Sequence, residues 1–127
     1  MIAVDTSALM AIVLDEEQAA AYIAAIGAED DLVISAGTVA EALIVSARRN
    51  VQEEIASLID GLGFEIVSVT PAAARRIAQA YANWGKGIHP AGLNFGDCFA
   101  YDVAKQHDCP LLFVGDDFAK TDIERAI

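Results

Sequence analysis

Short apolar runs alternate with longer segments of helical pattern along the whole chain. The apolar runs have the length and the Ile, Val and Leu content of buried strands, and they cover residues 2–4, 32–35, 65–69 and 111–114. The segments between them carry helical periodicity or helix start and stop signals, and they cover residues 8–14, 15–26, 38–49, 52–59, 71–81 and 96–106. Strands that alternate with helices predict an α/β fold, with a central parallel sheet of four to five strands and helices on both faces.

Polar residues mark where the predicted helices begin. Thr6 or Ser7 follows the first strand and is expected to cap the first helix. Thr38 and Glu41 have the spacing of a capping box, which predicts a helix that starts there and runs through Arg49. The residues after 114 are expected to form a loop or a short terminal helix.

Length and composition predict a single domain that spans residues 1–127. A hydrophobic content of 55% excludes a disordered tail. The formal net charge of −11 argues against the broad basic surface of a protein that binds duplex DNA. It leaves room for nucleic acid held through metal ions and a few local cations, and for a basic protein partner.

The two cysteines, Cys98 and Cys109, form neither a paired framework nor a Cys-x-x-Cys motif. This usage favours a reducing, cytoplasmic setting. The first residues lack the basic and apolar regions of a signal peptide, and no apolar run approaches the ~20 residues that span a bilayer. We therefore expect a cytoplasmic protein without a membrane segment.

Four acidic residues stand at structurally telling positions, although each has an ordinary explanation. Asp5 and Asp116 suit turns, Glu41 suits the third position of a capping box, and Asp97 suits the first turn of a helix. Glu41 is the least ordinary of the four, because the helix around it is apolar on nearly every face. A charge in such a helix needs a partner or a solvated cleft.

The joint placement of the four acids is more informative than any one of them. Asp5 and Asp116 follow predicted strands, whereas Glu41 and Asp97 open predicted helices. In a parallel sheet the carboxyl ends of strands and the amino ends of helices share one edge, so all four acids are expected on one rim. Clustered carboxylates repel one another unless cations join them. Ligand sets made only of oxygen suit Mg²⁺ or Mn²⁺, which can activate water for attack on a phosphate.

The motifs around these acids resemble those of a known family. They are Val4-Asp5-Thr6-Ser7-Ala8, Thr38-Val39-Ala40-Glu41, the long segment at residues 85–101 that contains Asn94-Phe95-Gly96-Asp97-Cys98, and Gly115-Asp116-Asp117-Phe118. Together they cover nearly the whole chain, and the segment at 85–101 is the most specific. The sequence resembles PIN domains, and among them the VapC toxins of bacterial type II toxin–antitoxin pairs.

The resemblance implies a PIN-like three-layer α/β/α fold and a Mg²⁺- or Mn²⁺-dependent endoribonuclease. Asp5, Glu41 and Asp97 match the family's metal-binding acids. When the sequence is aligned with the family at Phe118, Gly115 falls where many relatives carry the fourth acid. Asp116 is therefore the nearest candidate, and Asp117 is the fallback. The implied partners are a VapB-type antitoxin with a basic tail, an RNA substrate such as tRNA or rRNA, and a second copy in a homodimer, with a heterotetramer or larger assembly when antitoxin is bound.

Three other functions fit the sequence less well. A phosphoryl-accepting regulatory domain would carry an acid after the third strand, where the sequence has Val69-Thr70-Pro71. A phosphatase of the haloacid dehalogenase type would carry a second aspartate two residues past Asp5, where Ser7 stands. A degenerate PIN domain that only binds protein or RNA is the remaining alternative, and the presence of Asp5, Glu41 and Asp97 argues against it.

Overall fold

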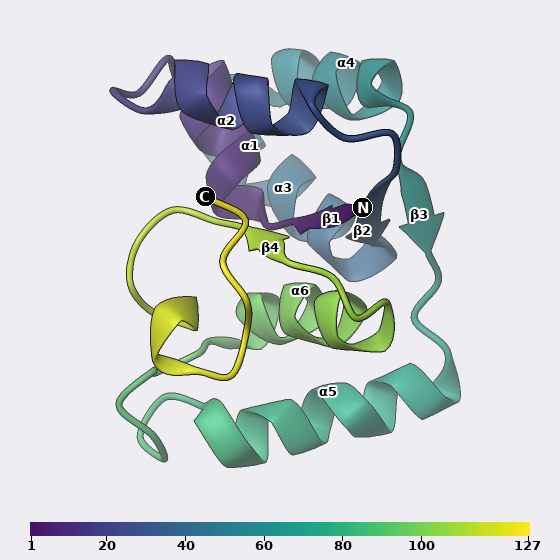
Figure 1. The fold of residues 1–127 in the computed structure, drawn as a ribbon, viewed down its shortest axis with the longest axis vertical. Helices are drawn as coiled ribbons and strands as arrows, with labels where there is room; N and C mark the ends of the chain where they lie inside the picture. The colour runs from purple at the N-terminus through teal and green to yellow at the C-terminus, as the bar shows by residue number, and fades with distance from the viewer.

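The computed structural model describes all of residues 1–127 as a parallel sheet between two layers of helices (Figure 1). The strands are β1 (Ile2–Val4), β2 (Leu32–Ser35), β3 (Glu65–Val67) and β4 (Leu111–Leu112), in the order β3-β2-β1-β4. All three strand pairs are parallel, which confirms the predicted fold class. Beyond β4, an isolated parallel bridge between Leu111 and Arg125 brings the C-terminal segment alongside the sheet.

The helices fall into two groups on opposite faces of the sheet. The complete set is α1 (Thr6–Val13), α2 (Ala19–Gly27), α3 (Ala36–Arg48), α4 (Gln52–Leu62), α5 (Pro71–Trp84), α6 (Phe95–Gln106) and the 3-10 turn η1 (Phe118–Lys120). The first four cover one face, and α5 and α6 cover the other (Figure 1). None of the helices combines the length and the apolar composition that crossing a membrane requires.

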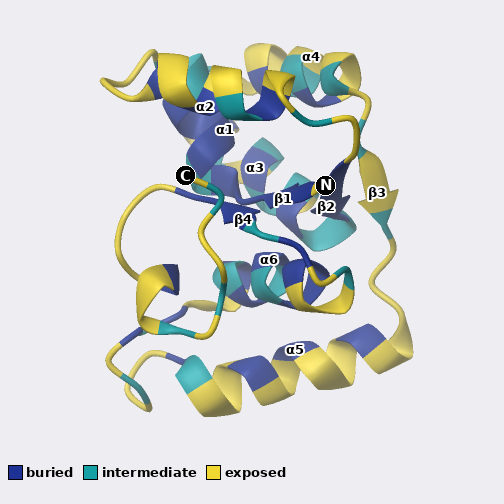
Figure 2. Cartoon of the chain, viewed as in Figure 1, coloured by how far each residue is buried: buried dark blue, intermediate teal, exposed yellow.

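Alternating side chains of the strands divide the core into two clusters. Ile2 and Val4 point into a cluster with α1 to α4, whereas Ala3, between them, points into a cluster with α5 and α6. All three residues of β1 are at most 3% exposed. Burial of a strand on both faces explains why its sequence is uniformly apolar. Figure 2 shows the same division, with buried inner faces and an exposed outer face on α5.

Two helix starts differ from the sequence prediction. Helix α1 is capped by Asp5, whose side chain accepts a hydrogen bond from the backbone N–H of Ser7, so the expectation of a Thr6 or Ser7 cap is wrong. Helix α3 begins at Ala36, because the Ser35 side chain accepts from a backbone N–H one turn ahead of the predicted capping box. In both cases the polar residue immediately before the helix, at or directly after the end of the strand, takes the capping role.

Helices α3 and α6 meet closely at the edge where the acids were expected. A Cβ atom added at Gly37, in the first turn of α3, would collide with the ring of Phe99 in α6. The missing side chain at this position therefore sets the separation of the two helices. Since Glu41 and Asp97 belong to these helices, the close contact also sets the separation of their backbones.

Backbone hydrogen bonds join the two ends of the loop between α5 and α6. The backbone N–H groups of Lys86 and Leu93 donate to the carbonyls of Leu93 and Trp84, at 2.9 and 3.0 Å. The Trp84 indole N–H donates to the Tyr101 hydroxyl (3.1 Å), and that hydroxyl donates to Asp122 (2.7 Å). These bonds fix the point at which the chain re-enters α6.

We expect Gly37→Ala to destabilise the fold by about 1–3 kcal/mol, because the new methyl group must displace the Phe99 ring. Gly61→Ala is the matched control. Gly61 lies within α4, and an added Cβ meets nothing within 4 Å, so this change should be neutral or stabilise by about 0.5–1 kcal/mol. Urea unfolding of the two variants measures both effects. Equal stability of the two variants would mean that the α3–α6 contact adapts without cost.

Candidate active site

Three of the predicted acids, Asp5, Glu41 and Asp97, line one pocket of about 330 Å³ at the carboxyl edge of the sheet. The other residues of its lining are Thr6, Ser7, Met10, Leu14, Glu16, Val45, Arg49 and Val114. Residues from α1, α3 and α6 meet here with Asp5, which directly follows β1, although they are distant in sequence. We call this hollow the acid pocket.

Asp5 is the most deeply buried of the three acids, at 3% exposure. Its Oδ2 atom accepts hydrogen bonds from the N–H and the hydroxyl of Ser7, at 3.1 and 2.6 Å. The Ser7 hydroxyl oxygen in turn accepts from the backbone N–H of Val114 (3.0 Å), just beyond β4. The end of β1, the start of α1 and the end of β4 are thus joined through one carboxylate and one hydroxyl.

Glu41 is oriented by a hydroxyl group from α1, and a glycine on α6 leaves room for its carboxylate. The Thr6 hydroxyl donates to Glu41 Oε1 (2.6 Å), so α1 holds the carboxylate that α3 carries. A Cβ atom added at Gly96 would overlap the Glu41 carboxylate. The absence of a side chain at residue 96 therefore lets Glu41 lie directly against the start of α6. Sequence reasoning missed this role of Gly96, although its position immediately before Asp97 was a signal.

Asp97 lies at the third position of a capping box. Its Oδ2 accepts from the N–H of Asn94 (2.9 Å), and its own N–H donates to Asn94 Oδ1 (2.8 Å). This arrangement is the ordinary helix-start role that the sequence allowed, and it also points the carboxyl group into the acid pocket. The loop before Asn94, whose ends are joined by backbone hydrogen bonds, holds the capping box in place.

Burial makes two of the carboxyl groups hard to ionise in the absence of a cation. The pKa of Asp5 is raised from 3.8 to about 7, chiefly by burial and also by the charges of Asp97 and Glu41, against the opposing hydrogen bonds from Ser7. Burial likewise raises the pKa of Asp97 to about 6, with additional effects from the charges of Glu41 and Asp117. A bound cation would favour the ionised form of both groups.

The carboxyl groups fit a divalent ion in their chemistry, since each keeps one oxygen free. Asp5 Oδ1 is buried and has no hydrogen-bond partner. Glu41 and Asp97 each use a single oxygen, Oε1 and Oδ2, in hydrogen bonds to the protein. A buried oxygen without a partner is costly, and a metal ion would satisfy it. No three of these side chains lie close enough together to form a finished ligand set.

The fourth acid is the least defined part of the site. Asp116 borders a separate hollow with Glu16, Glu17 and Arg125 rather than the acid pocket. The charge of Asp117, by contrast, is near enough to raise the pKa of Asp97. Neither aspartate lines the acid pocket, and the charge effect on Asp97 favours the fallback residue, Asp117, over the nearest candidate, Asp116.

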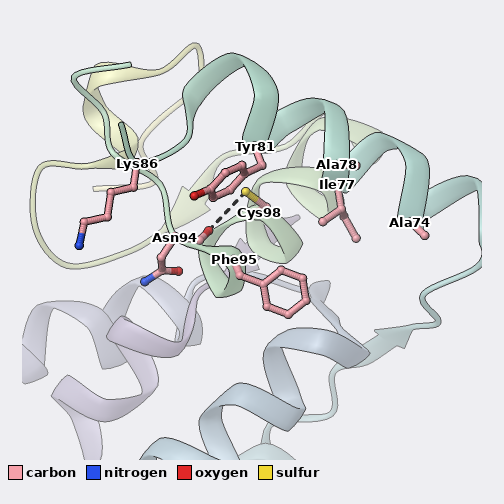
Figure 3. A pocket seen from close by; sticks show the side chains of 8 residues that line it. All are labelled: Ala74, Ile77, Ala78, Tyr81, Lys86, Asn94, Phe95 and Cys98. Atoms are coloured by element: carbon pink, nitrogen blue, oxygen red, sulfur yellow. Dashed lines mark hydrogen bonds between the residues drawn. The ribbon is translucent and has the colours of Figure 1, made fainter. Parts of the chain in front are cut away.

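A larger hollow of about 490 Å³ lies beyond Asn94 and Phe95, on the α5 side of α6 (Figure 3). Its walls are mostly apolar and include Ile77, Tyr81 and Cys98. Lys86 lines this hollow and is absent from the lining of the acid pocket, although the sequence places it in the loop before Asp97. No acidic residue lines this hollow, so it lacks the carboxylate ligands that the acid pocket offers to a metal ion.

Comparison with known proteins gives matches along almost the full chain. The PIN domain family matches residues 2–124. The chain is 41% identical to VapC ribonuclease Mb0625 of Mycobacterium bovis and to ribonuclease VapC28 of Mycobacterium tuberculosis, over 98% of this chain and 96% of each relative. It is 40% identical to ribonuclease VapC30 of Mycobacterium tuberculosis, over 94% of both chains.

Two solved structures share the fold. One is the Mycobacterium tuberculosis toxin VapC20, described as cleaving the sarcin-ricin loop, with a TM-score of 0.78, 13% identity and coverage of 97% of this chain and 96% of that one. The other is a toxin–antitoxin complex from Klebsiella pneumoniae, with a TM-score of 0.72, 18% identity and coverage of 96% and 93%.

The raised pKa of Asp5 predicts that acid stabilises the metal-free protein. A carboxyl group whose pKa is higher when folded contributes stability that is complete below the unfolded value of 3.8 and is lost as the pH rises through about 7. Lowering the pH from 8 to 6 in chelator should therefore add about 1.4 kcal/mol through Asp5 alone. Denaturant unfolding at both pH values measures the gain, and Asp5→Asn should remove most of it. A gain that persists in Asp5→Asn would assign the effect to other groups.

The space at residue 96 predicts a variant that separates metal binding from folding. In Gly96→Ala the new methyl group should push the flexible Glu41 side chain aside, so stability in chelator should change by less than about 1 kcal/mol. A hundredfold excess of Mg²⁺ or Mn²⁺ over its dissociation constant should stabilise the unmodified protein by about 2.7 kcal/mol, and Gly96→Ala should lose most of that gain. Thermal unfolding with and without metal compares the two. An undiminished metal effect in Gly96→Ala would show that Glu41 is not a ligand.

Proposed function

The chain belongs to the PIN domain family, and on that premise we propose that it is a metal-dependent endoribonuclease that acts as the toxin of a VapBC-type toxin–antitoxin pair. The names of its relatives as VapC ribonucleases, at about 40% identity over nearly the whole chain, support the activity. The observation that carries the proposal is the acid pocket, in which Asp5, Glu41 and Asp97 each keep one carboxylate oxygen free.

The residues of the pocket have two kinds of role: the acids would bind a metal ion, and their neighbours fix the orientation of the acids. Asp5, Glu41 and Asp97 would bind Mg²⁺ or Mn²⁺, which when bound supplies an activated water and positive charge beside the phosphate. Ser7 fixes the orientation of Asp5, and Thr6 fixes that of Glu41. The Asn94 N–H fixes Asp97 and leaves its second oxygen available. Each of these side chains is thus held in one orientation before an ion binds, so binding would cost little conformational entropy.

We assign Asp117 as the fourth acid, in place of Asp116. Its support is electrostatic proximity to Asp97 and the position of Asp116 at a different hollow. Asp117 is exposed, and it precedes the buried Phe118 of η1, which packs against Phe113 with ring centroids 5.2 Å apart. That packing anchors the turn that presents Asp117.

The proposed partners follow from the charge and exposed surface of the chain. An antitoxin segment with basic residues would place an Arg or Lys against the carboxylates, by charge complementarity with a chain of net charge −11. The structural similarity to a Klebsiella pneumoniae toxin–antitoxin complex is consistent with such a partner.

A homodimer is supported by large exposed apolar side chains such as Phe95 (71%) and Ile44 (57%). Light scattering of the chain, alone and with antitoxin, tests both assemblies.

We expect Asp97→Asn to abolish RNA cleavage while preserving the fold. Asparagine keeps an oxygen that accepts from the Asn94 N–H, so the capping box survives, whereas the negative charge for the ion is lost. The loss in rate should exceed the roughly 10- to 100-fold that removal of an outer-shell partner costs. The assay is cleavage of a structured RNA in Mg²⁺ or Mn²⁺, with a chelator control and circular dichroism to verify folding.

Two further variants in the same assay assign the fourth acid. Asp117→Asn should reduce cleavage more than Asp116→Asn if the assignment to Asp117 is correct, and the reverse order would restore Asp116. Full activity in Asp97→Asn, or cleavage that survives chelation, would refute the metal mechanism. It would leave the degenerate PIN domain that only binds a partner as the better reading.

A further inference from the structure

Arg49 is the one cationic side chain among the residues that line the acid pocket. It follows Glu41 and Val45 at intervals of four residues, as the C-cap of α3, and all three line the pocket. Arg49 lies about 12 Å along the helix axis from Glu41. Its side chain nevertheless borders the same hollow as the three carboxylates.

The Arg49 side chain has no partner within the protein. The ion pairs of the chain are those of the N-terminus with Glu29, of Arg76 with Asp102 and of Lys105 with Asp122. Arg125 donates to backbone carbonyls and lies over the Phe113 ring. Arg49 is exposed at the rim of an acidic hollow and is paired with none of the hollow's carboxylates.

We propose that Arg49 is a positioning residue, which binds a phosphate of the RNA strand next to the phosphate that lies at the carboxylates. This inference rests on the proposed ribonuclease function. A polyanion that enters a pocket lined by Asp5, Glu16, Glu41 and Asp97 is repelled, and an ion among the acids offsets that repulsion only at the reacting phosphate. The neighbouring phosphate needs a cation of its own, and Arg49 supplies it.

Arginine suits this task better than lysine would. The planar guanidinium offers two parallel N–H donors to two phosphate oxygens and stays charged at every relevant pH. Its separation from Glu41 along α3 places it to one side of the acids rather than among them. It therefore contacts a part of the strand that does not react, and it should govern RNA affinity more than the rate of the bound complex.

Arg48, the last residue of α3 and the neighbour of Arg49, is a matched control. It is also exposed and also without an ion-pair partner, but it lines a different hollow, whose lining includes Glu41, Ile44 and Phe99 and neither Asp5 nor Asp97. Removal of either arginine changes the net charge of the chain by the same amount. Only Arg49 lines the acid pocket together with Asp5 and Asp97, so a specific contact at that pocket and a general charge effect give different results.

The experiment measures binding of a fluorescein-labelled single-stranded RNA to the full chain and to Arg49→Gln, Arg49→Lys and Arg48→Gln. Binding is followed by fluorescence anisotropy over a range of KCl concentrations in Ca²⁺, and a gel verifies that the RNA stays intact. Loss of one phosphate contact should reduce the slope of log K against log[KCl] by about 0.7. Arg49→Gln should show that reduction and an affinity about tenfold lower, whereas Arg48→Gln should keep the original slope.

Cleavage kinetics in Mg²⁺ supply the second readout. Arg49→Gln should raise KM about tenfold and leave kcat within about twofold, and Arg49→Lys should recover part of the KM effect. An unchanged slope and KM in Arg49→Gln, or equal changes in Arg48→Gln, would overturn the assignment. A fall in kcat with a higher Mg²⁺ requirement and an unchanged KM would also overturn it, because Arg49 would then act on the carboxylates. If the unmodified chain binds RNA but does not cleave it, the ribonuclease proposal fails while the salt slopes still decide the role of Arg49.

Discussion

The buried carboxyl group of Asp5 is the constraint on which the rest of the site depends. It directly follows β1, which has a neighbour on each side and helices on both faces, and it is only 3% exposed. One oxygen caps α1 and binds Ser7, and Ser7 holds the backbone beyond β4. The other oxygen has no partner inside the protein. A single side chain therefore links the central strand, the first helix and the last strand, and it retains an unsatisfied atom at the place where the ion would bind.

Two glycines allow the remaining acids to approach Asp5. Gly37 lets α3 and α6 pack against each other, and Gly96 leaves room for the Glu41 carboxylate between them. These positions act through the absence of a side chain rather than through a contact. A larger residue at either position would change the geometry of the acids without altering any charge. Packing and chemistry at this edge are consequently set by the same pair of helices.

The sequence could predict the fold class, the strands and the three acids of the pocket, because each leaves a local pattern. Apolar runs, helix-start residues and the alternation of the two determine a parallel sheet, and that sheet gathers its strand ends on one edge. Helix starts at Asp5 and Ser35 were misplaced by one to three residues, since several neighbouring polar residues can each serve as a cap. The fourth acid could not be resolved, because the conformation of the turn after β4 decides which of two adjacent aspartates lies nearer to Asp97. Gly96 depends on a contact between residues 55 positions apart, which no local pattern encodes.

The order of the strands also bears on when the protein becomes active during its synthesis. The pocket joins residues near the start of the chain to Asp97 and to the Val114 backbone, and β4, the last strand made, pairs with β1, the first. The pairing of β4 with β1 therefore occurs only after the final part of the chain has left the ribosome. A toxin with this topology has no assembled acid pocket while it is being translated, so the interval before its activity begins is at least the time needed to synthesise nearly the whole protein.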